Sequence, residues 1–185
     1  MTFNPRLSRD ETIAFLTRWR NHHPIPTEDD EAQHVDCFVS QYIALNRLCN
    51  ELWAQNHGSW PSPRSGGGDK CRATTRLALS LDCPNLIVAI DAIGEKGLAA
   101  LQEALGRTGR FFLSSENEPP HFDGYDRLTP NEQVERILEA LYKLRCNMFH
   151  GAKGLEVRQQ EVLSPANLCL NAVLDAGLAA LRARP

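Results

Sequence analysis

The stretch from Thr129 to Gly154 constrains the fold most, because it carries the clearest helix signal in the chain. Thr129 is a suitable N-cap, Pro130 fits the first helical position, and Glu132 can reach back to close a capping box. Apolar residues then recur at spacings of three and four: Val134, Ile137, Leu138, Leu141, Leu144 and Met148. This pattern predicts a helix with one buried face, and Gly151 marks its end.

The beginning of the chain predicts a short helix followed by a long one. Ser8 and Glu11 form a second capping box at the start of the short helix. Thr27 is expected to cap the next helix, whose apolar positions extend from Val35 to Trp53. We expect this helix to have more than six turns and to lie in the core.

Later segments favour helices as well. Pro84 begins a run that is strand-like in composition, but a proline in a first turn favours a helix. An Ala/Leu-rich helix follows and should stop at Gly106 or Gly109, and Ser164 with Pro165 is expected to cap the last helix. The predicted fold class is therefore all-α, a helical bundle with a long irregular loop.

Length and composition predict one domain over 1–185, with an N-terminal helical appendage over about 1–26. The six cysteines lie far apart without a CxxC pair, which indicates reduced thiols. No leader and no membrane-spanning run are recognised, so we expect a cytoplasmic protein with no membrane partner. The net charge of −3 argues against a protein that coats nucleic acid, but a local site can still be basic.

Arg145, Asn147 and His150 combine polar chemistry with the end of the helix that begins at Thr129. One interpretation is structural, because cationic side chains stabilise the negative end of a helix dipole by about 0.3–1 kcal/mol. Cys146 and His150 have the spacing of half of a metal site, but no second pair completes it, so no metal or cofactor is expected. On one ideal helix Arg145 and His150 lie about 140° and ~7.5 Å apart. A site containing both therefore needs more than one helix or a broken last turn.

The heptapeptide RCNMFHG at 145–151 resembles the Arg-x(4–6)-His motif of HEPN domains, all-helical modules that include many metal-independent endoribonucleases. The segment DCFVSQYIALNRLCNELW is similar to the long first core helix of HEPN proteins from abortive-infection and defence systems. A closing amphipathic helix follows the motif here as it does there, so the resemblance covers about 28–182. One departure is Cys146, where the family commonly has a polar residue, often Asn; Asn147 stands next to it.

The resemblance implies a homodimer that cleaves RNA by attack of the ribose 2′-OH, in a toxin or phage-defence context and with an antitoxin or defence protein as a further partner. His150 would transfer protons, Arg145 would neutralise the phosphate, and Asn147 would orient either group. The alternative is a HEPN module without cleavage activity, which binds RNA or a nucleotide or regulates through dimerisation.

Four basic residues are candidates for contacts with RNA phosphates. Lys143 and Lys153 flank the motif, and Arg72 and Arg76 lie four apart on a helix expected over 70–81. The simpler interpretation of the arginine pair is a solvated helix face. The Gly- and Pro-rich loop over 56–69 is either a nucleotide-stacking lid or a connector.

Overall fold

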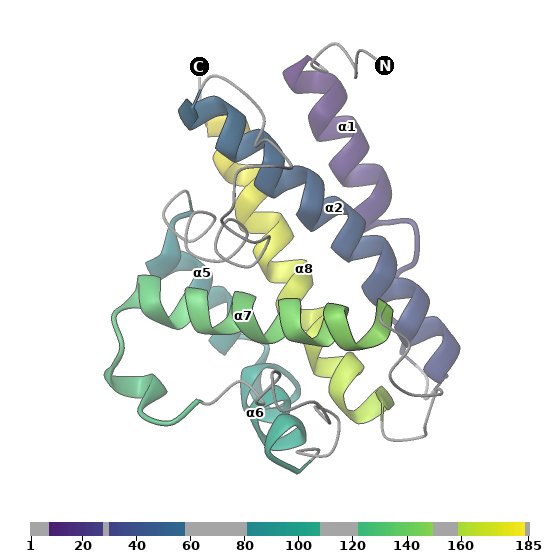
Figure 1. Cartoon of the computed structure of the whole chain (residues 1–185), viewed down its shortest axis with the longest axis vertical. Helices are drawn as coiled ribbons and strands as arrows, with labels where there is room; N and C mark the ends of the chain where they lie inside the picture. Colours follow the sequence, from purple (N-terminus) through teal and green to yellow (C-terminus); the bar gives the residue numbers. More distant parts are fainter. Residues whose placement is uncertain (1–7, 28–29, 58–80, 108–121, 150–158, 184–185) are drawn as a thin grey trace.

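The computed structural model describes residues 8–27, 30–57, 81–107, 122–149 and 159–183 (Figure 1). Helices make up 84% of this part of the chain and it contains no strand, which confirms the all-α class. The elements in order are α1 (Arg9–Arg20), α2 (Glu31–His57), α5 (Cys83–Asp91), the 3₁₀ turn η1 (Gly94–Lys96), α6 (Leu98–Arg107), the 3₁₀ turn η3 (Tyr125–Arg127), α7 (Pro130–Phe149) and α8 (Gln159–Ala183). The predicted helix over 70–81, except for its last residue, and the predicted loop beyond His57 lie outside the described residues.

The two longest helices, α2 and α8, lie side by side and share the most extensive helix–helix interface (Figure 1). The short helix α1 packs against both of them, and α7 crosses them at a steep angle while packing along α5 (Figure 1). Leucines from these helices meet in one core, in which Leu48, Leu101, Leu141 and Leu170 are fully buried. Burial of one apolar face per helix is thus what holds the bundle together.

Helix α7 starts and packs as its sequence predicts. The Thr129 N–H donates to Glu132 Oε2 at 2.8 Å, and the Glu132 N–H donates to Thr129 Oγ1 at 3.4 Å, which together close the capping box. The five residues of the predicted apolar face from Val134 to Leu144 are buried, and Met148 packs against the core. The helix ends at Phe149, two residues before Gly151.

The capping box of α7 predicts a pH-dependent contribution to stability. Hydrogen bonds from the Thr129 hydroxyl and backbone hold the pKa of the Glu132 carboxyl below its usual 4.5. A carboxyl whose pKa is lower in the folded state stabilises fully above the unfolded pKa and loses this contribution as the pH falls through the folded pKa. In thermal melts, Glu132→Ala should therefore be less stable than wild type at pH 7, and the gap should narrow from about pH 4.5 downward. Thr129→Ala should weaken the same pH dependence, and a gap that stays constant down to about pH 2.5 would contradict the assignment.

Two helix starts differ from the predictions. Helix α2 begins at Glu31, not after Thr27, because Asp30 provides the cap: its side chain accepts the Gln33 N–H at 3.3 Å. Helix α8 begins at Gln159, so Ser164 and Pro165 do not cap it and Pro165 lies inside the helix. Pro165 has no N–H to donate to the carbonyl of Glu161, four residues earlier. The helix tolerates this loss because Glu161 lies near the helix start and is exposed.

The other described helices agree with the sequence. Ser8 and Glu11 close the capping box of α1, with the Glu11 N–H donating to Ser8 Oγ at 3.2 Å. The strand-like run is a helix, α5, capped by Asp82, whose side chain accepts the Asn85 N–H. Helix α6 ends at Arg107, and the five described cysteines are free thiols.

Helix α8 is both long and apolar. By length and composition alone, its segment Glu161–Ala183 could cross a membrane, which the sequence analysis did not recognise. In its most apolar window of 18 residues 61% of the residues are buried, and the helix packs against α2 and α6 among others. Its packing as a core helix accounts for its apolar composition.

Candidate functional site

The predicted catalytic motif lies at the end of α7, and the structure describes it in part. Arg145 is half-buried in the last turns of the helix, and His150 follows Phe149, the final helical residue, directly in the sequence. Asn147 belongs to α7, but its side chain is not described. The remaining predicted site residues outside the described part are His150, Lys153, Arg72 and Arg76.

Arg145 lies close to Tyr42, which α2 contributes to the same region. Burial raises the pKa of the Tyr42 phenol well above its usual range; the Cys49 thiol raises it further, whereas the Arg145 guanidinium opposes this rise. Tyr142 and Cys146 of α7 act on the same phenol, so residues of two helices gather around it. Tyr42 lies among the apolar positions between Val35 and Trp53, and no pattern within that helix indicates that residues of α7 act on its phenol.

The Tyr42 phenol and the Cys49 thiol that acts on it are both uncharged at neutral pH. Because its pKa is raised, Tyr42 stays protonated at neutral pH and presents no anion to the guanidinium. Burial likewise raises the pKa of the Cys49 thiol to about 12, so this residue is not a thiolate. Arg145 Nη1 also lies 3.9 Å from Cys146 Sγ, a weak contact with a polarizable sulfur atom. The planar, permanently charged guanidinium group of an arginine is suited to bind an anionic oxygen.

Lys143, a predicted RNA contact, is already engaged on the surface of α7. Its Nζ lies 3.6 Å from Glu139 Oε1, and 15% of its side chain is exposed. Arg136 approaches the other oxygen of Glu139 at 3.6 Å. A phosphate reaching Lys143 would therefore compete with Glu139 for the ammonium group.

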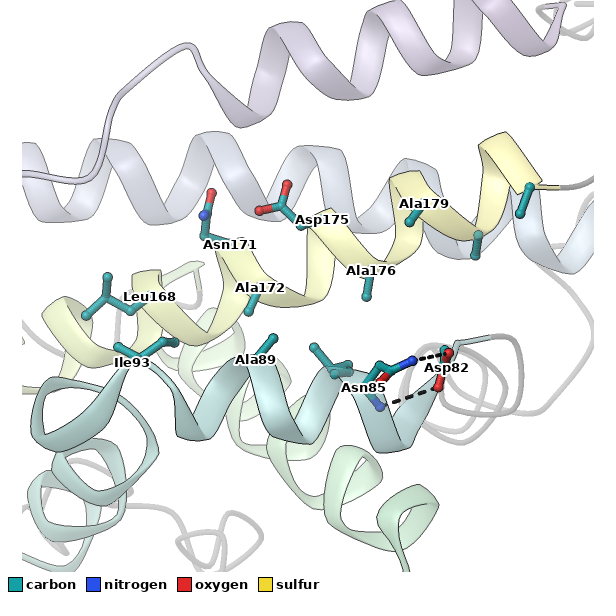
Figure 2. A pocket seen from close by; sticks show the side chains of 13 residues that line it. Asp82, Asn85, Ala89, Ile93, Leu168, Asn171, Ala172, Asp175, Ala176 and Ala179 are labelled. Atoms are coloured by element: carbon teal, nitrogen blue, oxygen red, sulfur yellow. Dashed lines mark hydrogen bonds between the residues drawn. The ribbon is translucent and has the colours of Figure 1, made fainter.

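A second feature, absent from the sequence analysis, is a groove of about 630 Å³ between α5 and α8 (Figure 2). Asp82 and Asn85 lie at one end of it, and Leu168 and Ile93 lie at the other (Figure 2). Alanines of α8 separated by three or four residues form much of its lining. This spacing was a usable signal in the sequence, but alanine is so common in helices that only the neighbouring α5 gives it meaning.

The described residues contain no group of three or more His, Cys, Asp and Glu side chains placed to hold a metal ion. Comparison with known proteins adds no relative: no family model, no curated protein and no solved structure matches this chain. Function must therefore be argued from the chain's own residues.

Proposed function

We propose that the chain is a metal-independent endoribonuclease of the HEPN type, with its site at the end of α7. The observation that carries the proposal is the position of Arg145, which is half-buried in α7 about one turn before the helix ends at Phe149 and His150 follows in the sequence. The HEPN-like motif contains the same two residues, and the all-α fold class agrees with that family.

The chemistry assigned to the site is transesterification within RNA. The ribose 2′-oxygen loses its proton and bonds to the adjacent phosphorus while the bond from phosphorus to the 5′-oxygen breaks, and that oxygen takes up a proton. The products are a 2′,3′-cyclic phosphate and a 5′-hydroxyl end. His150 performs one of the two proton transfers, and Arg145 neutralises the charge on the phosphorane oxygens. Asn147 orients one of these groups, and RNA is the partner of the site.

The direct test is to incubate the purified chain with structured and single-stranded RNAs in EDTA and to identify the ends of the fragments. Cleavage that leaves 2′,3′-cyclic phosphates supports the proposal. Cleavage that EDTA abolishes, or fragments with 5′-phosphate ends, would contradict it. An intact RNA set would instead favour the non-cleaving binding module.

The spacing of the motif further predicts that each site is shared between two chains. On one straight helix residues 145 and 150 would stand about 140° apart, so we expect Arg145 of one chain to act with His150 of the partner subunit. Mixing Arg145→Ala with His150→Ala chains should then restore roughly a quarter of the wild-type activity, because half of the dimers are mixed and each has one complete site. Sedimentation should show a dimer at micromolar concentration. A monomer, or a mixture without restored activity, would refute the shared site.

A further inference from the structure

The groove between α5 and α8 is shaped to accommodate another helix. Its lining on α8 follows one helical stripe from Leu168 to Ala183, at steps of three and four, over about 22 Å of helix. Its lining on α5 follows the same rule from Asp82 to Ile93. Two parallel walls with helical periodicity are what a bundle presents where one further helix would pack.

Small side chains make the groove suited to close approach. Five of the residues that line it on α8 are alanines, and Ala89 extends the same lining onto α5. Ala172 and Ala176 lie on the side of α8 that faces α5, whereas Asn171 and Asp175 lie on its far side (Figure 2). Short side chains leave room for larger apolar residues of an incoming helix to enter between the two walls.

One large apolar side chain is exposed next to the groove. Val88 of α5 is 66% exposed and is the one large hydrophobic side chain of the described residues that stands exposed. It lies on α5 three residues after Asn85 and one before Ala89, both of which line the groove. A helix that covers the groove would remove part of this side chain from water as well.

The charge of the lining residues distinguishes between the partners that could bind in the groove. The described lining contains two carboxylates, Asp82 and Asp175, and no Lys, Arg or His. Asp175 lies on the far side of α8 (Figure 2) and is paired with Arg20 at 2.6 Å, whereas Asp82 accepts hydrogen bonds from the backbone and side-chain amides of Asn85 and has no ionic partner among the described residues. A second copy docked through the same groove would bring no basic residue of the described lining to Asp82, whereas a Lys or Arg of another protein would complement its charge.

We infer that the groove binds an amphipathic helix of a partner protein, with apolar side chains between α5 and α8 and a Lys or Arg beside Asp82. This surface is separate from the proposed cleavage site and does not depend on cleavage. It gives the chain a docking face for a basic helical segment.

The test uses a fluorescent helical peptide of about 18 residues, with Leu and Ala on one face and Lys along the flanks, and a twin with Glu in place of Lys. Fluorescence anisotropy should show saturable binding of the lysine peptide below about 1 mM and binding of the glutamate twin about tenfold weaker or less. Two variants probe the site: Ala179→Gln narrows the groove at an exposed alanine, and Asp82→Asn removes the charge but keeps a good N-cap for α5.

Ala179→Gln should weaken the lysine peptide about tenfold, and the matched variant Ala99→Gln, at an exposed alanine of α6 outside the groove, should not. Asp82→Asn should reduce the preference for the lysine peptide over the glutamate twin. If Ala179→Gln lowers the stability of the chain, the result for Asp82→Asn decides the test. Absence of binding, equal binding of the two peptides, or equal effects of Ala179→Gln and Ala99→Gln would each overturn the proposal. A self-association that Ala179→Gln abolishes, without peptide binding, would assign the groove to a second copy instead.

Discussion

His150→Ala and Arg145→Ala are each expected to lower metal-independent RNA cleavage by about 10²–10⁴-fold, because each removes a group that acts only as the phosphorus–oxygen bonds exchange. Arg145→Lys should recover a small part of the loss, since an ammonium supplies charge without the planar pair of donors. The measurement is single-turnover cleavage in EDTA, with the fragment ends identified. Arg136→Ala is the matched control, since it removes an arginine of the same helix that is 38% exposed and pairs with Glu139.

Melting curves separate catalysis from folding in these variants. Loss of a cation near a helix end costs at most about 1 kcal/mol, far less than the expected loss in rate. A variant that folds as wild type does but cleaves RNA equally fast would show that its residue takes no part. An Arg145→Ala chain that unfolds would show that this half-buried side chain holds α2 and α7 together near Tyr42, and Arg145→Lys would then carry the catalytic test.

The sequence predicts a helix start correctly where the capping residues are close neighbours in the chain. Thr129 and Glu132 interact with each other across three residues, and so do Ser8 and Glu11, so neighbouring residues alone determine these ends. The start of α8 shows the opposite case. From the sequence alone, Pro165 indicates the first turn of a helix. In the structure Pro165 is buried in the bundle, and the helix begins six residues earlier. Tertiary packing outweighed the local preference there.

The position of the motif at the end of α7 was predictable from the sequence, whereas its surroundings were not. The motif from Arg145 to His150 and the end of α7 at Phe149 follow from spacing and capping signals within one segment. The approach of Tyr42 to Arg145 joins residues about a hundred positions apart, and no periodicity within either helix encodes it. The groove likewise exists only because α5 lies along α8.

Gly177 permits a close approach of α8 to Leu48 of α2. A Cβ atom at this position would lie 2.1 Å from Leu48 Cδ2 and 3.0 Å from Leu48 Cδ1. Leu48 is 0% exposed, so it has no free space into which to move. Gly177→Ala should therefore cost about 1–3 kcal/mol through overpacking, offset in part by about 1 kcal/mol of improved helix propensity.

A double-mutant cycle checks this explanation by a change of sign. Leu48→Ala alone should destabilise the chain by about 2–5 kcal/mol, because it leaves a cavity in the core. In that background Gly177→Ala should stabilise, since its methyl group enters the vacated space and the helix gains propensity. Urea unfolding of wild type, both single variants and the double variant gives the four free energies. If the two changes simply add, the Gly177 backbone does not approach Leu48 as closely as described, and the packing of α2 against α8 must rest on other contacts.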